Sequence, residues 1–214
     1  MSKIGEQNVQ GHFTRTLDSK LNQRYKESHH YSRGELNGRL DKIYADYFAE
    51  VGTMCVLIEF KEFETEVKSE KKKPLRRKLC VEIPEEFEPT SYDCHFISWR
   101  LDEPRNMSIR LDRYISKVCP LFDIDYDEFE LIDGDEFIDD LLNEDIGSDY
   151  NDFIEYLDYL ASLEDGSTPP SGGGKFGGVL YIVNKALDRM LTITYSSLTE
   201  LLSLKKEYGL YSTN

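Results

Sequence analysis

The sequence has no hydrophobic run long enough to cross a membrane. Its longest apolar stretch, Met54–Ile58, is far shorter than the roughly 20 residues that a membrane-spanning helix needs. Residues 1–7 also lack the apolar segment of a secretory signal. We therefore expect a soluble protein of the cytoplasm that has no membrane partner.

Cysteine is scarce, and its spacing is not that of a metal or redox motif. No two cysteines form a C-x-x-C pair, which disfavours a zinc site and a disulfide-exchange site. In a chain with no visible export signal, we expect free thiols kept reduced in the cytosol. The cysteines concerned are Cys55, Cys80, Cys94 and Cys119.

Positive charge is absent from one long stretch. Residues 118–174 contain no Lys or Arg, yet they hold 18 of the 41 acidic residues. The rest of the chain has 26 basic and 23 acidic residues, so a mildly basic body is joined to a strongly acidic segment, Asp123–Asp165, and the net charge is −15. Such asymmetry bears on partners and solubility rather than on the fold.

Apolar side chains are interleaved with the carboxylates of this acidic segment. Their spacing predicts two short helices, over residues 135–143 and 148–163. One interpretation is an ordinary solvated outer face of these helices. The other is a surface that imitates the phosphates of DNA or that binds a basic protein partner.

The remaining pattern alternates between helices and strands. Ser32 and Glu35 form a capping box, and the apolar spacing after them predicts a helix that ends at Gly52. A further helix is expected over residues 14–25, and strands are expected at 54–61, 94–99, 178–183 and 191–195. Ser196 and Ser197 are candidate caps of a last helix.

These elements predict a mixed α/β fold, with a small central sheet flanked by helices and an acidic, mainly helical insertion. The glycines of residues 172–178 precede a strand rather than open a helix, so we interpret them as a connector and not as a phosphate loop. The expected division is a loose N-terminus (1–12), a mixed core with the candidate site (13–118), the acidic insertion (119–166), a Gly-, Pro- and Ser-rich loop (167–178), and a strand pair with a C-terminal helix (179–214).

Glu59 and Lys61 end the first of the expected strands. Because side chains alternate along a strand, both point to the same side of the sheet. A carboxylate there can hold a divalent cation, and the ammonium can orient a water for attack on phosphorus. A strand-end ion pair is the simpler alternative.

In this Glu-x-Lys after apolar residues, the sequence resembles the PD-(D/E)xK nuclease superfamily. The resemblance covers residues 32–100 and implies a Mg²⁺ site at Glu59. An acidic residue on the first helix often joins the family's site, and Glu35 or Asp41 is the candidate here, with Asp41 the second metal ligand. The family also places an Asp on a separate strand before the Glu-x-Lys strand. In this chain the preceding residues predict a helix, on which Asp41 can approach Glu59 while Asp46 faces water.

A basic cluster follows the Glu-x-Lys strand, where it would suit a nucleic-acid backbone. Its members are Lys71, Lys72, Lys73, Arg76, Arg77 and Lys78, and Pro74 is expected in the first turn of a helix. His95 could reach Glu59 if its strand is a neighbour.

The sequence thus supports two hypotheses. One is a metal-dependent, nuclease-like protein with a role in defence or mobile-element conflict. The other is a non-enzymatic, acidic inhibitor or immunity-type protein that binds a basic partner through Asp123–Asp165.

Overall fold

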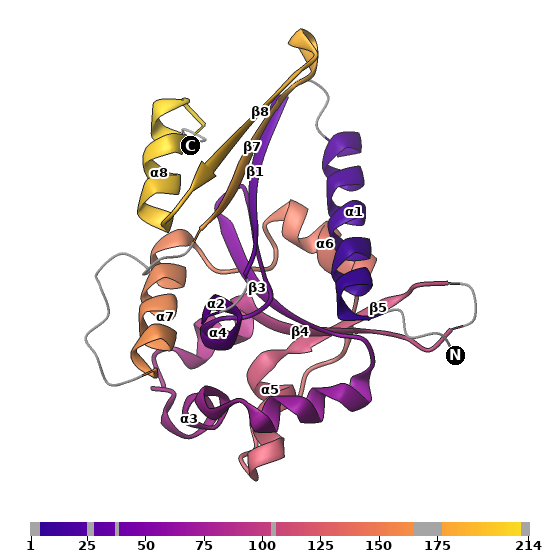
Figure 1. Cartoon of the computed structure of the whole chain (residues 1–214), viewed down its shortest axis with the longest axis vertical. Helices are drawn as coiled ribbons and strands as arrows, with labels where there is room; N and C mark the ends of the chain where they lie inside the picture. Colours follow the sequence, from indigo (N-terminus) through magenta and orange to yellow (C-terminus); the bar gives the residue numbers. More distant parts are fainter. Residues whose placement is uncertain (1–4, 25–27, 37–38, 104–105, 165–176, 211–214) are drawn as a thin grey trace.

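The computed structural model describes residues 5–24, 28–36, 39–103, 106–164 and 177–210. These residues form three layers, with one mixed β-sheet between two layers of helices (Figure 1), which confirms the predicted mixed α/β class. The elements, with η denoting 3₁₀ helices, are α1 (Glu6–Arg24), β1 (Ser28–Glu35), α2 (Arg39–Ile43), β2 (Tyr47–Val51), β3 (Met54–Lys61), η1 (Glu64–Lys72), α3 (Pro74–Glu82), α4 (Glu88–Cys94), β4 (His95–Arg100), β5 (Ile109–Arg113), α5 (Tyr114–Val118), η2 (Cys119–Phe122), β6 (Ile132–Asp133), α6 (Gly134–Asn143), α7 (Tyr150–Ser162), β7 (Gly178–Asn184), η3 (Lys185–Leu187), β8 (Arg189–Tyr195) and α8 (Leu198–Glu207).

Among the described residues the sheet has eight strands, in the order β6-β5-β4-β3-β2-β1-β7-β8. Strands β1, β2 and β3 pair antiparallel in succession, whereas β4 lies parallel to β3, with His95 beside Leu57. A parallel pair needs a crossover connection, and η1, α3 and α4 provide it. The segment with the basic cluster is therefore held against the end of β3.

The two faces of the sheet have separate hydrophobic cores. Helices α1 and α6 cover one face, where Val56, Ile58 and Phe60 of β3 are buried. The other core contains Leu57 of β3 and buried residues of α3, α4, α5 and α7. Because β3 alternates between these faces, Glu59 and Lys61 lie on the same face as Leu57.

The helix expected over residues 32–51 is not formed. Residues 28–35 are strand β1, the short helix α2 follows, and residues 47–51 are strand β2. All five residues of β2 are buried, since the strand lies inside the sheet between β1 and β3. A two-residue turn at Gly52 and Thr53 joins β2 to β3, and Gly52 has a φ of +61°, which favours glycine.

The ends of the expected divisions also differ from the structure. Helix α1 begins at Glu6, so most of the N-terminus expected to be loose is helical, and Val9 is fully buried. The two acidic helices exist as α6 and α7, but they pack on opposite faces of the sheet. Of the loop expected at 167–178, only Gly177 and Gly178 are among the described residues, and Gly178 begins β7.

A disulfide joins Cys80 of α3 to Cys119 of η2, so the expectation of four free thiols is wrong for this pair. Packing of α3 against η2 brings the two Cα atoms to 5.3 Å, although they are 39 residues apart in the sequence. Cys55 and Cys94 are free and buried. No helix in the described part of the chain is long and apolar enough to span a membrane.

Candidate active site

Glu59 and Lys61 lie at the end of β3, as the two-residue period predicts. Glu59 is 1% exposed and Lys61 is 3% exposed. The Lys61 Nζ donates a hydrogen bond of 2.5 Å to Glu59 Oε1. This pair is therefore buried, and not a strand-end ion pair in water.

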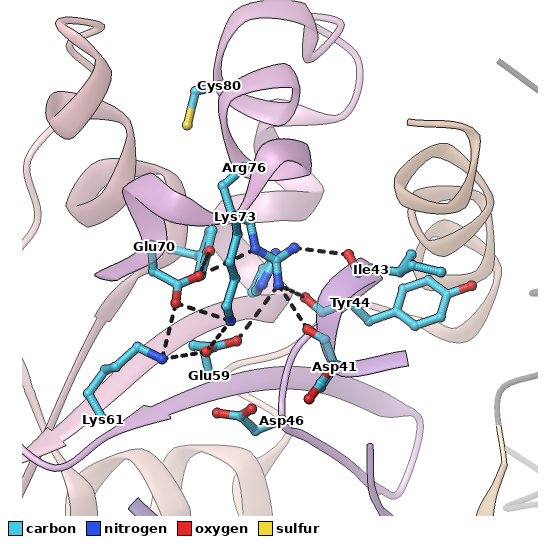
Figure 2. Close-up of polar contacts among 12 residues, drawn as sticks. Asp41, Ile43, Tyr44, Asp46, Glu59, Lys61, Glu70, Lys73, Arg76 and Cys80 are labelled. Atoms are coloured by element: carbon cyan, nitrogen blue, oxygen red, sulfur yellow. Dashed lines mark hydrogen bonds and ion pairs between the residues drawn. The ribbon is translucent and has the colours of Figure 1, made fainter. Parts of the chain in front are cut away.

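A second acid and a second lysine reach the pair from the crossover. Glu70 of η1 is fully buried, and its Oε1 lies 3.0 Å from Lys61 Nζ. Lys73, the residue between η1 and α3, places its Nζ 2.6 Å from Glu59 Oε1 and 3.1 Å from Glu70 Oε1 (Figure 2). Two buried carboxylates and two ammonium groups thus form one network.

Arg76 completes the network from α3, which begins at Pro74 as predicted. Its guanidinium is buried, lies 3.4 Å from Glu70 Oε2 and 3.7 Å from Glu59 Oε2, and stacks over the ring of Tyr114. It also donates to the backbone carbonyls that precede β2, those of Asp41, Ile43 and Tyr44, at 2.9 to 3.2 Å (Figure 2). Arg76 therefore ties the segment before β2 to the acids of β3 and η1.

Asp46 lies one residue before β2. Tyr47 pairs with Ile58, so one further step in this antiparallel register brings Asp46 opposite Glu59. The backbone N–H of Phe60 donates to Asp46 Oδ2 at 2.7 Å. Burial and the neighbouring Glu59 together raise the pKa of Asp46 to about 7.

Glu70 and Lys61 are held charged by their partners. Burial alone would raise the pKa of Glu70, but Lys61, Lys73 and Arg76 outweigh it and hold this pKa at about 2. Burial likewise works to lower the pKa of Lys61, while Glu59 and Glu70 raise it above its usual value. The site thus combines fixed charges with one carboxyl group, that of Asp46, which titrates near neutral pH.

Asp46 and Glu59 are the two carboxylates that could share a magnesium ion. In the described residues there is no group of three or more His, Cys, Asp or Glu side chains placed to hold a metal. Mg²⁺, however, is commonly held by one or two carboxylates together with substrate phosphates and water. Glu59 Oε2 is buried and accepts no hydrogen bond, but the Arg76 guanidinium lies 3.7 Å from it, so both oxygens of Glu59 have a cation nearby.

The other predicted acids lie elsewhere. Asp41 contributes its backbone carbonyl to Arg76, and no carboxylate oxygen of Asp41 takes part in the network described above. Glu35 ends β1 across from Tyr47, with its side chain exposed. The helix that was expected to present both acids to Glu59 is replaced by β1, α2 and β2, and the strand pairing brings Asp46 to Glu59 instead.

The basic cluster is divided by its surroundings. Lys71, Lys72 and Arg77 are exposed, whereas Arg76 is buried and Lys73 points inward to Glu59. Lys78 donates to the backbone carbonyl of Leu163. Some residues of the cluster are therefore exposed to solvent, and others line the site.

An acid of the first helix also reaches the site. Glu6 Oε1 of α1 lies 3.8 Å from Lys61 Nζ, and half of the Glu6 side chain is exposed. Burial is the largest influence on Glu6 and raises the pKa of its carboxyl. Glu6 lines an open pocket of about 550 Å³ whose other walls are Glu66, Lys68, Ser69, Lys71 and Lys72. The pocket thus brings exposed lysines to the outer side of Lys61.

Sequence reasoning missed Asp46, Glu6, Glu70 and the inward role of Arg76. The signal for Asp46 was the mostly apolar segment of residues 47–51, followed by a Gly-x turn and an apolar run at 54–58, which is a hairpin pattern. His95, expected near Glu59 if the strands were neighbours, does lie on the adjacent strand. Its ring instead stacks on Tyr114 and its Nδ1 is 2.9 Å from the Tyr156 hydroxyl.

Burial lowers the pKa of His95, so the ring is neutral at physiological pH. Its stacking partner Tyr114 donates a hydrogen bond from its hydroxyl to Glu70 Oε2 at 2.5 Å, so His95 supports the site through this ring.

Comparison of the chain with protein families, with curated proteins and with solved structures finds no match, and the function therefore has to be inferred from the site itself.

Proposed function

We propose that this protein is a metal-dependent, nuclease-like phosphodiesterase of the PD-(D/E)xK type. The observation that carries the proposal is the position of Asp46, which lies opposite Glu59 at the start of the adjacent strand, with Lys61 bonded to Glu59. An Asp on a separate strand before the Glu-x-Lys strand is what the resemblance requires and what the sequence appeared to lack. Glu6 supplies the acid on the first helix.

In this proposal Asp46 and Glu59 hold Mg²⁺. A bound magnesium ion would lower the pKa of a water and neutralise charge on the phosphoryl oxygens. The Lys61 ammonium, fixed by Glu59 and Glu70, would orient the attacking water and stabilise the negative charge on the phosphoryl oxygens in the transition state. Arg76 is a positioning residue, because it holds both the Asp46 segment and Glu59.

The substrate would be a nucleic-acid strand, DNA or RNA, lying against the pocket beside Glu6. Lys68, Lys71 and Lys72 line this pocket and offer ammonium groups to a phosphate backbone. Binding through lysines at an exposed surface predicts an affinity that falls steeply as salt is raised. The net charge of −15 would partly offset this dependence, because it repels nucleic acid at long range and salt screens that repulsion.

The test is cleavage of supercoiled plasmid and of single-stranded RNA with Mg²⁺ or Mn²⁺. Lys61→Met should abolish cleavage, while Lys206→Met, an exposed lysine of α8, should leave it unchanged. Circular dichroism and thermal unfolding check that both variants are folded. Absence of cleavage by the folded wild-type protein on every substrate, with either metal, would contradict the proposal.

The alternative hypothesis, capture of a basic protein by Asp123–Asp165, has less support. It needs the carboxylates of this segment to share a surface, whereas α6 and α7 pack on opposite faces of the sheet. We therefore favour the nuclease proposal. A role in defence or mobile-element conflict, and a location in the cytoplasm where nucleic acid is accessible, belong to the same proposal.

A further inference from the structure

The buried carboxylate of Glu59 lies in an unusually positive environment. Three cationic side chains approach this one carboxylate: Lys61 and Lys73 at Oε1, and Arg76 at Oε2. A divalent ion that bound Glu59 with all three in place would enter a buried site already rich in positive charge. Repulsion between the ion and the nearest ammonium would oppose binding. One of the three cations therefore has to leave for the ion to bind.

Two of the three cations are fixed. Lys61 belongs to the central strand β3, is 3% exposed and is shared between Glu59 and Glu70. Arg76 is 1% exposed and is bonded to three backbone carbonyls as well as to the acids. Moving either group would leave buried hydrogen-bonding partners unsatisfied, which is costly.

Lys73 differs from both. Its side chain is 29% exposed, and it stands in the extended residue between η1 and α3, so a change of rotamer can carry its Nζ into water. Its contacts in the described structure are with Glu59 Oε1 and Glu70 Oε1. Glu70 keeps Lys61, Arg76 and the Tyr114 hydroxyl when Lys73 leaves.

We propose that Lys73 is an internal counter-ion that stands in for the metal at Glu59 Oε1, and that a divalent cation binds by displacing its ammonium into solvent. The inference rests on the proposed function, because it takes Glu59 as a metal ligand. Without Lys73 or a metal, the buried carboxylates of Glu59, Glu70 and Asp46 would have only Lys61 and Arg76 to balance them. Buried charge that is not balanced destabilises a folded protein strongly.

The displacement has a measurable consequence for metal affinity. Part of the binding free energy of the metal is used to break the contacts of Lys73 with Glu59 and Glu70. A variant that lacks the ammonium has no such contacts to break. We therefore expect Lys73→Met to bind Mn²⁺ about tenfold more tightly than the wild-type protein, or more, since charge-assisted hydrogen bonds are of that strength.

The experiment is calorimetric titration of the full chain with Mn²⁺, for the wild-type protein, Lys73→Met and Lys73→Gln. Lys206→Met is the control, because Lys206 is an exposed lysine of α8 that lies outside the network and outside the pocket. Tighter Mn²⁺ binding by both Lys73 variants, with Lys206→Met unchanged, supports the inference. Adding Asp46→Asn to Lys73→Met should then weaken binding, which places the ion between the two acids.

Two results separate the inference from the proposed function. If the wild-type protein binds Mn²⁺ and the Lys73 variants bind it equally or more weakly, Lys73 does not compete with metal, and the nuclease proposal stands without it. If the wild-type protein and all variants bind no Mn²⁺, the metal assignment fails and the inference fails with it.

Folding of the variants is followed by thermal unfolding, because Lys73→Met removes charge from a buried network. We expect its Tm without metal to be lower than that of the wild-type protein, and Mn²⁺ to raise this Tm by more than it raises the wild-type value. Lys73→Gln keeps a polar side chain that can hydrogen-bond Glu59. An equal Mn²⁺ shift in Tm for the wild-type protein and both Lys73 variants would overturn the inference.

Discussion

Asp46 lies one residue before β2, opposite Glu59 of β3 in the register of the two strands, and the charge of Glu59 makes ionisation of Asp46 less favourable. The pKa of Asp46 is raised to about 7, mainly by burial and to a smaller extent by the charge of Glu59. Two acids in this relationship are costly in the folded protein unless a cation lies between them. Acids with perturbed pKa values cluster at functional sites, and this relationship therefore supports the proposed metal site.

Asp46→Asn should lower cleavage activity at least about 100-fold, because loss of one metal ligand removes several kcal/mol of charge stabilisation in the transition state. The matched control is Asp41→Asn, whose carboxylate takes no part in the site network. Plasmid cleavage rates at saturating Mg²⁺ measure both effects. Equal losses in the two variants would contradict the assignment of Asp46.

The same substitution should change how stability depends on pH. An unfolded Asp ionises near pH 4, whereas folded Asp46 keeps its proton to about pH 7. Between these values the folded state binds more protons than the unfolded state, so wild-type stability falls as pH rises. Asp46→Asn lacks this fall, so it should be more stable than the wild-type protein at pH 8, by up to about 4 kcal/mol.

Denaturant unfolding at pH 4 and pH 8 measures this difference. The gain of Asp46→Asn over the wild-type protein should be nearly gone at pH 4, where folded Asp46 is protonated and the unfolded Asp is about half ionised. A constant difference at every pH would show that the titration of Asp46 does not contribute.

Arg76→Met should lower the free energy of unfolding by about 3 to 5 kcal/mol, because it leaves Glu70 and Glu59 buried with fewer cations and frees three carbonyls. Arg77→Met, at the next and exposed position, should change it by no more than about 0.5 kcal/mol. Urea unfolding compares the two directly. Similar values for both variants would mean that Arg76 does not anchor the segment before β2.

Glu6→Gln should reduce cleavage by about tenfold or less while stability stays within about 0.5 kcal/mol, since half-exposed ion pairs contribute little to folding. Glu66→Gln, on the same pocket, is the control. Rate measurements under single-turnover conditions would detect the difference. No effect of Glu6→Gln on the rate would place Glu6 outside the site.

Reduction of the Cys80–Cys119 disulfide should lower the free energy of unfolding by about 2 to 4 kcal/mol, as expected for a loop of this length. Thermal unfolding with and without reductant, and with Cys80→Ala plus Cys119→Ala, measures this. Alkylation of protein taken from cells under non-reducing conditions shows which form exists there. Alkylation of Cys80 in this native protein would show that the pair is reduced in the cell, as expected in the cytosol.

The positions of many elements could be predicted from local pattern. The strand at 54–61, the helix beginning at Pro74 and the acidic helices each have a period or a cap that is legible in the sequence, and all are present. The helix predicted over 32–51 is wrong, although Leu36, Ile43, Tyr47 and Val51 fit a helical stripe. Residues 47–51 are buried on both faces of a sheet, where a strand is mostly apolar on both sides, and the apolar positions of such a strand can also match a helical period.

The position of Glu59 and Lys61 on one side of a strand follows from the sequence alone, because alternation along a strand is a local property of the backbone. The acid that lies opposite Glu59, and the inward direction of Lys73 and Arg76, depend on tertiary packing. Strand pairing and the crossover joined residues 46, 59, 70 and 76, and such long-range contacts depend on how whole elements pack rather than on any single local pattern.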